Sequence, residues 1–320
     1  MFLVTNLFYI NRTWGSHDKR HNIMATSTNI TNEIEKIVND RFMSKAEKDE
    51  CLLKLGFRKQ DINLIWFTHR KRGYRPTFVV GNLTFGVEIE CYHANRYALQ
   101  NALAQRGLTG VQTGYHHHES RTEYRLATDC SIHGNDPCEC VSPILKGSAG
   151  ERSLKAACDA LASVGAQVNR SCGLHVHFGA AKLTDKHYVR IFKNYQMCEA
   201  VIDSFMPESR RGSANTYCKS ICGVSFANCT TKASVKMAMH HDRYYKVNAM
   251  SYDSHGTIEF RHHSGSTNYT KIIMWVEFLR ELIDYSHDHE ITTRPTSVDD
   301  LPFVSATVKN YLKNRINEVA

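Results

Sequence analysis

Three short stretches of the chain alternate apolar and ionisable residues, which is the pattern of a β-strand with one buried face. They are Phe85–Cys91, Cys172–Phe178 and Thr257–His263. In each stretch the ionisable residues fall on the face opposite to the apolar one: Glu88 and Glu90, then His175 and His177, then Glu259, Arg261 and His263. If the three strands share a sheet, one face packs and the other collects carboxylates, imidazoles and a guanidinium.

The face that holds the ionisable side chains needs a cation to offset the repulsion between its carboxylates. Glu88 and Glu90 lie on one side of one strand, about 7 Å apart by the strand rise, and such like charges repel unless a cation lies between them. Carboxylates together with imidazoles suit a divalent metal ion. Arg261 adds a forked donor that matches a phosphate or a carboxylate. The three strands therefore predict a metal site that handles an anionic group.

Composition describes a globular chain with a basic N-terminal part. The 320 residues are 42% hydrophobic, which is enough for a sizeable core. The net charge is +8, and residues 1–80 hold 14 Lys/Arg against 8 Asp/Glu. The basic-aromatic run in residues 58–76 leaves open a non-enzymatic module that binds nucleic acid. A nucleic-acid partner is disfavoured because the charge forms no long block, and a solvated surface explains it.

Cysteine usage predicts a reducing compartment. Eleven cysteines with scattered spacing argue against a disulfide framework, and we expect a cytoplasmic protein. No run of about 18 apolar residues occurs, so we expect no membrane partner. Met1–Ile10 is too short and too interrupted to predict a signal peptide.

Strand and helix patterns follow one another along the chain and predict an α+β fold. We expect an N-terminal extension over residues 1–78, first disordered and then helical, a main domain over 79–290, and a helical tail over 291–320. Helices are predicted from Asn32 onward and over Lys45–Leu55, Ala94–Gln105, Glu151–Val164, Thr184–Phe205, Lys232–His241, Tyr269–Tyr285 and about Val304–Ile316. Further short strands are predicted over Glu123–Ala127, from Glu139 to Pro143, and after Arg243.

Each motif is weak alone, but their order is specific. In chain order they are Phe85–Glu90, Asp129-x-Ser131, Glu139-x-Val141-Ser142-Pro143, Cys172–His177, Arg243-x-Tyr245-x-x-Asn248 and Thr257–Arg261. This series resembles the putative amidoligase family of the carboxylate–amine ligase superfamily, to which glutamine synthetase and glutamate–cysteine ligase belong. The resemblance covers roughly residues 80–285, so the main domain would be the catalytic one.

The resemblance implies a fold and a reaction. The implied fold is a glutamine-synthetase-like curved, mostly antiparallel sheet with helices packed on its outer face. The implied reaction is ATP-dependent amide or isopeptide formation through an acyl phosphate, with Mg²⁺ or Mn²⁺. The partners would be a carboxylate and an amine substrate, among them peptides or amino acids. The chain has no Gly-x-x-x-x-Gly-Lys-Ser/Thr loop, so ATP enters through the resemblance alone.

The resemblance also implies roles for single residues. The metal ligands would be Glu88, His175 and Glu259 beside the nucleotide phosphates, with Glu90 and Glu139 nearer the acceptor carboxylate. The catalytic residues would be Arg261, Glu259, Arg243 and His177, and the nucleotide would contact Arg261, Arg243 and Asn248. Asp129 and Tyr245 would shape the pocket, and His263 lies on the same predicted face. The Cys-rich residues 213–230 match no pattern, and we expect acceptor specificity in such loops.

A second hypothesis keeps the metals and drops ATP. The ligand set Glu88, Glu90, Glu139, His175 and Glu259 would then activate water in a metal-dependent hydrolase.

Overall fold

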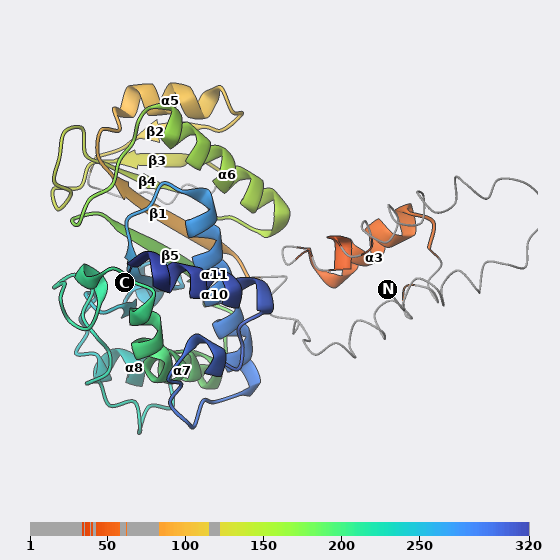
Figure 1. Ribbon diagram of the computed structural model, residues 1–320, viewed down its shortest axis with the longest axis vertical. Coiled ribbons are helices and arrows are strands. Elements are labelled where there is room, and N and C mark those ends of the chain that lie inside the picture. The colour runs from red at the N-terminus through yellow and green to blue at the C-terminus, as the bar shows by residue number, and fades with distance from the viewer. Residues whose placement is uncertain are drawn as a thin grey trace, which may run out of the picture. The chain divides into compact units, whose positions relative to one another are not determined.

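The computed structural model describes residues 34, 36–38, 40, 43–57, 62, 83–114 and 122–319 (Figure 1). The chain divides into two compact units, Met1–Asn82 and Leu83–Ala320. Within the described residues, no helix is both long and apolar enough to cross a membrane. The finer division of the chain at residues 78 and 290 stays a prediction.

The N-terminal unit contains helix α3 (Lys45–Lys54), close to its predicted bounds. Its start is fixed by a capping box, in which the Glu47 amide donates to Ser44 Oγ (3.2 Å) and the Ser44 amide donates to Glu47 Oε2 (2.7 Å). Leu52 of α3 is buried against Val38 and Ile62. The part of the extension that we expect to be disordered, at the start of residues 1–78, lies outside the described residues, as does all of the basic run in 58–76 except Ile62.

The second unit is built on a seven-stranded sheet with the order β2-β3-β4-β1-β5-β7-β6. The strands are β1 (Phe85–Cys91), β2 (Gly110–Gln112), β3 (Tyr124–Ala127), β4 (Cys138–Val141), β5 (Gly173–Gly179), β6 (Val247–Asn248) and β7 (Thr257–Ser264). Neighbouring strands are antiparallel except β2 and β3. The mixed α+β class and the mostly antiparallel sheet are confirmed, and the glutamine-synthetase-like curvature stays a prediction.

Register brings the ionisable residues together. Directly opposed residues of antiparallel strands place their side chains on the same face. Three such pairs join neighbouring strands: Glu88 with His175, His177 with Glu259, and Glu90 with Glu139. The three predicted strands therefore lie side by side in the order β1-β5-β7, with β4 supplying a fourth strand on the other side of β1.

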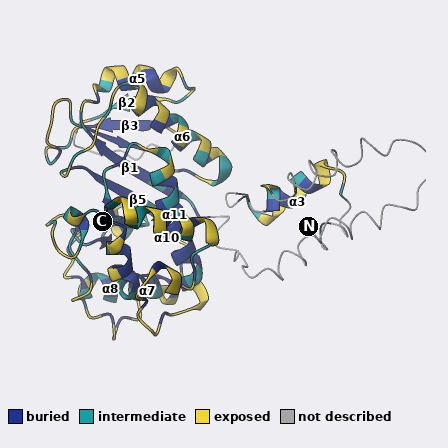
Figure 2. Ribbon diagram, viewed as in Figure 1, coloured by how far each residue is buried: buried dark blue, intermediate teal, exposed yellow. Residues whose placement is uncertain are grey.

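Helices cover the apolar face of the sheet. The second unit contains α5 (Arg96–Ala104), α6 (Gly147–Ser163), α7 (Asp185–Ser204), η2 (Glu208–Arg210), α8 (Lys232–Ala238), α9 (Ser251–His255), α10 (Tyr269–Asp288), η3 (Val298–Asp300) and α11 (Ala306–Val319). Helix α10 packs against both α6 and α7. The Tyr195 ring of α7 lies 5.6 Å from that of Phe260, and Tyr124 Oη lies 3.0 Å from Ser153 Oγ of α6. The core thus lies between the strands, mostly buried in Figure 2, and these helices.

Helix α6 begins four residues before its predicted start. The prediction has Lys146–Gly150 lead into a helix that starts at Glu151. In the structure Gly150 is the first-turn residue that donates to Lys146 O (3.0 Å). A Cβ atom on Gly150 would lie 2.9 Å from Leu145 Cβ. The start of α6 packs so closely on Leu145 that residue 150 has to be a glycine.

A β-bulge in β7 overturns the predicted position of His263. Strand β7 pairs Phe260 with Val176, but His263 with Leu174, so the register shifts by one residue between them. A bulge places one extra residue on one strand, and His263 follows Leu174 onto the helix-covered face. Its ring lies 5.7 Å from that of Trp275 in α10. The expectation that His263 shares the face of Glu259 is wrong.

Candidate active site

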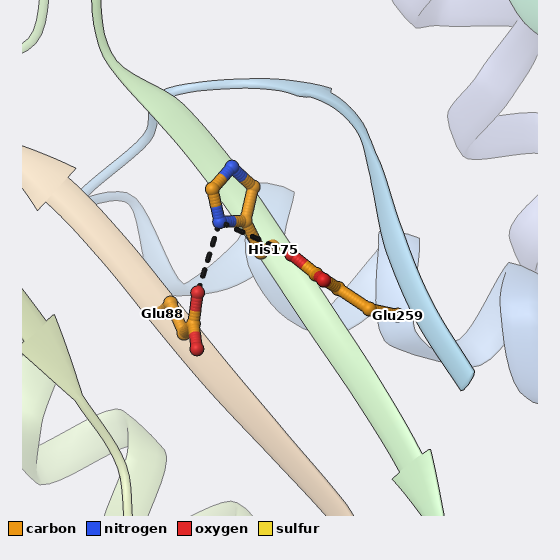
Figure 3. A group of neighbouring side chains, drawn as sticks. All are labelled: Glu88, His175 and Glu259. Atoms are coloured by element: carbon orange, nitrogen blue, oxygen red, sulfur yellow. Dashed lines mark hydrogen bonds and ion pairs between the residues drawn. The ribbon is translucent and has the colours of Figure 1, made fainter. Parts of the chain in front are cut away.

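The first cluster joins three adjacent strands. His175 Nδ1 of β5 lies 2.9 Å from Glu88 Oε2 of β1 and 3.6 Å from Glu259 Oε1 of β7. Figure 3 shows the two carboxylates converging on one imidazole. Each of the three residues offers one ligand atom within 4.8 Å of the others, so together they could hold one metal ion. This is the first predicted ligand set.

The second cluster shares His175. Glu90 of β1, Glu139 of β4 and the same imidazole also offer ligand atoms within 4.8 Å of one another. Nε2 of His175 lies 3.5 Å from Glu90 Oε1, whereas Nδ1 faces the first cluster. One imidazole therefore stands between two groups of carboxylates and offers a different nitrogen to each.

Gly173 gives the shared imidazole its space. The Gly173 amide donates to Glu90 Oε2 (2.5 Å), which fixes that carboxylate. A Cβ atom on Gly173 would lie 2.8 Å from His175 Nε2 and 3.4 Å from Glu90 Oε2. The ring can occupy the junction of the two clusters because residue 173 has no side chain.

The carboxylates of the two clusters differ in their pKa. Burial, followed by the charges of Glu88 and Glu90, raises the pKa of Glu139 well above its ordinary range. Burial also acts to raise the pKa of Glu259, but the charges of Arg261 and then His177 outweigh it and lower that pKa. A site in which one carboxyl resists ionisation because of its neighbours suits a divalent cation.

Glu88 is the carboxylate of the clusters most open to solvent, with 22% of its side chain exposed. Desolvation would raise its pKa, but the charge of His177 and hydrogen bonds from His175 and His177 hold that pKa well below its ordinary range. In turn, burial lowers the pKa of His177, and the charge of Glu88 outweighs this and raises it. His177 Nε2 lies 3.2 Å from Glu88 Oε1, and its Nδ1 lies 3.0 Å from Thr257 Oγ1.

Glu259 is held from two sides. Arg261 Nη1 donates to its Oε1 (2.5 Å), and Asn248 Nδ2 donates to its Oε2 (2.6 Å). The Asn248 amide group is itself fixed, because its Oδ1 accepts from the Met250 amide (2.7 Å). Burial acts to lower the pKa of Arg261, but the charges of Glu259 and then Glu88 outweigh it and raise that pKa. The guanidinium therefore stays charged. The carboxylate and the guanidinium therefore form a fixed pair beside the first cluster.

Other predicted residues lie outside the two clusters. Arg243 is exposed and its Cζ lies 5.1 Å from the centre of the Tyr244 ring. Lys219 Nζ lies 4.9 Å from the centre of the Tyr245 ring. Asp129 Oδ1 accepts from the Ser131 amide (2.7 Å), and its charge contributes to raising the pKa of Glu139. The roles of these residues stay predictions.

Sequence reasoning missed Tyr217. Its carbonyl oxygen accepts from Arg261 Nε (3.3 Å), which fixes the second side of the guanidinium. The residue is 52% exposed, and its ring meets that of Tyr244 edge to face at 5.5 Å. A contact through a main-chain carbonyl leaves no side-chain pattern, and only the exposed tyrosine within the Cys-rich residues 213–230 could have drawn notice.

Comparison with known proteins shows the family of the chain. No curated protein matches the chain. A family described as "putative amidoligase enzyme" matches residues 81–225 and 223–283, which is more than half of the chain and includes all four cluster strands. The name of that family describes an enzyme of the ligase type. The chain belongs to the putative amidoligase family.

Proposed function

We propose that the protein is an ATP-dependent carboxylate–amine ligase that works through an acyl phosphate. One observation carries the proposal: two clusters of carboxylates meet at His175, beside a guanidinium held against Glu259. Phosphoryl transfer needs little covalent chemistry from a protein and depends on positioning and charge neutralisation. A buried group of acids with one fixed arginine has the composition that such chemistry needs.

The proposed reaction has two steps. A carboxylate oxygen of the first substrate attacks the γ-phosphorus of ATP, and ADP leaves. The amine nitrogen of the second substrate then attacks the acyl carbon, its proton is released, and phosphate leaves. Divalent ions, Mg²⁺ or Mn²⁺, bound by the first set (Glu88, His175, Glu259) and by Glu90 with Glu139, would supply positive charge for the phosphate oxygens.

The chain's own residues orient and neutralise. Arg261 faces the transferring phosphoryl group and offsets the charge of the acyl phosphate. Asn248 keeps Glu259 in place, so that the carboxylate and Arg261 hold one geometry through both steps. His177, paired with Glu88, orients the anionic substrate. Arg243 meets the nucleotide at the rim of the site.

The substrates and the compartment follow from the same proposal. The acceptor is a carboxylate of a peptide or an amino acid, and the donor is an amine. The cytoplasm is the proposed compartment. All eleven cysteines are free thiols, and eight of them are buried, which supports a reducing environment.

Nucleotide binding tests the proposal without knowledge of the acceptor. We expect Mg²⁺ and ADP together to raise the melting temperature of the purified chain, and ATP to give phosphate release with the correct acceptor. Glu259→Gln and Arg261→Ala should each remove phosphate release while the protein stays folded. Glu290→Gln is the matched control, because that carboxylate is 47% exposed, lies 3.6 Å from Lys193 Nζ and belongs to neither cluster. This variant should keep both signals.

The hydrolase hypothesis gives a different result. A metal-dependent hydrolase would gain stability from the metal ion alone and would not respond to ADP. Full phosphate release by either Glu259→Gln or Arg261→Ala would refute the ligase assignment of those residues.

A further inference from the structure

Residues 212–224 reach the catalytic groups at one point, the carbonyl of Tyr217. That oxygen accepts from Arg261 Nε at 3.3 Å. None of residues 212–224, all of which the structure describes, belongs to a helix or a strand. Bonds within the segment, such as those from the Tyr217 amide to Asn215 Oδ1 (2.8 Å) and from the Ser220 amide to Ser213 Oγ (3.2 Å), form local turns. The place of these turns relative to Arg261 depends on contacts from outside the segment.

Helix α7 supplies these contacts from one polar face. Gln196, Glu199 and Asp203 follow one another at spacings of three and four residues, so their side chains share a face of the helix. All three bond main-chain groups of the segment: Gln196 Nε2 donates to Ile221 O (2.6 Å) and Val224 O (2.7 Å), Glu199 Oε2 accepts from the Ile221 amide (2.9 Å), and Asp203 Oδ2 accepts from the Gly212 amide (2.8 Å).

Lys246 connects the same face to the catalytic strand. Its fully buried ammonium donates to Glu199 Oε1 (2.8 Å) and Asp203 Oδ1 (2.6 Å). Its main-chain amide donates to Lys219 O (2.8 Å), and its carbonyl accepts from the Arg261 amide (2.8 Å). One residue thus links the helix, the segment and the residue that carries the guanidinium.

The charges of Glu199, Asp203 and Lys246 fix the position of residues 212–224 rather than add to folding stability. Burying an ammonium and two carboxylates costs desolvation energy that apolar side chains would avoid. Apolar replacements, however, would leave the Gly212 and Ile221 amides without acceptors. We propose that Gln196, Glu199 and Lys246 are positioning residues, which set the place of Tyr217 and through it the direction of the Arg261 guanidinium. The catalytic consequence rests on the proposed function, and the geometric one does not.

Two amide side chains on α7 give a matched test. Gln196→Met removes the bonds to residues 221 and 224 and keeps the length of the side chain. Asn194→Leu removes a comparable anchor elsewhere, because Asn194 donates to His289 O (3.0 Å) and accepts from the Ile291 amide (2.7 Å). Both variants lose side-chain anchors of a loop, but only the first loop touches Arg261.

The first readout is spectroscopic and independent of catalysis. In protein labelled with ¹⁵N-arginine, the Nε–H resonance of Arg261 is assigned by its absence from Arg261→Ala. We expect this resonance to move in Gln196→Met and to stay in place in Asn194→Leu. An unmoved resonance in Gln196→Met, or an equal movement in both variants, would overturn the proposal.

The second readout is turnover. We expect kcat for phosphate release to fall at least about tenfold in Gln196→Met, since a misplacement of about 1 Å in a catalytic group can cost on the order of a hundredfold, and to stay unchanged in Asn194→Leu. If Gln196→Met does not fold, Glu199→Gln weakens the hold on Lys246 and should move the same resonance. If Mg²⁺ and ADP leave the melting temperature of the wild-type protein unchanged, the proposed function fails, and the resonance still decides the positioning role.

Discussion

The imidazole of His262 should make folding stability depend on pH. The ring is fully buried behind β7, where Tyr195 Oη lies 2.6 Å from Nδ1 and Asp203 Oδ1 lies 2.7 Å from Nε2. A carboxylate only accepts hydrogen bonds, so Nε2 carries the proton and Tyr195 donates to Nδ1. Burial lowers the pKa of His262 from 6.5 to about 4. The hydrogen bond to Asp203 acts to raise this pKa, and the charge of Lys246 acts to lower it.

The size of the effect follows from that shift. Between pH 4 and pH 6.5 the unfolded chain binds a proton at His262 that the folded protein does not. The stability from the neutral ring is therefore fully present above pH 6.5 and falls as the pH approaches 4. At about 1.4 kcal/mol for each pKa unit the whole window amounts to about 3 kcal/mol, of which about 2 kcal/mol is lost between pH 7.5 and pH 5.

Urea denaturation at pH 7.5 and pH 5 measures this loss. His262→Gln is the informative variant, because its amide still donates to Asp203 but does not titrate in this range. Between the two pH values, the free energy of unfolding of the wild type should fall about 2 kcal/mol more than that of His262→Gln. His133→Gln, at an exposed position, should behave as the wild type does. Equal pH dependence of wild type and His262→Gln would refute the reasoning.

Two further substitutions test the site itself. Gly173→Ala should displace the His175 ring, because the new Cβ would lie 2.8 Å from His175 Nε2. The variant should therefore lose the rise in melting temperature with Mg²⁺ and ADP. Gly114→Ala is the control, because no atom lies within 4 Å of the new Cβ there. An unchanged rise in Gly173→Ala would contradict the role of the glycine. Asn248→Ala removes the donor to Glu259 Oε2 (2.6 Å) and should slow phosphate release about tenfold. A wild-type rate in that variant would show that Glu259 is held adequately without Asn248.

The alternation of apolar and ionisable residues was enough to predict most of the residues of the site. It placed Glu88, His175 and Glu259 on one face of their strands, and these residues do converge within 4.8 Å. Alternation alone gives the face but not the order of the strands or their register. The family resemblance supplied the pairing of Glu90 with Glu139, since residues 49 positions apart have no local pattern in common.

Sequence patterns failed where the backbone departs from regular geometry. A bulge shifts register without changing the alternation of residue types, so His263 was assigned to the wrong face. Tyr217 acts on Arg261 through a carbonyl group, which every residue has. Gly147–Gly150 stand ahead of the predicted helix, because residue types alone do not show how closely Gly150 packs on Leu145. In each case the deciding feature is backbone geometry, which residue types do not display.

The manner in which α7 holds residues 212–224 leaves the exposed side chains of that segment free to diverge, whereas Cys218 and Ile221 are buried. The anchors on Gly212, Ile221 and Val224 are all peptide groups, and a peptide group survives almost any substitution of the residue that bears it. Side chains beside the reactive centre could therefore be exchanged over evolutionary time while the arginine keeps its support. Such a division between a constant anchor and a replaceable lining would let related enzymes acquire new acceptors at little cost to their chemistry.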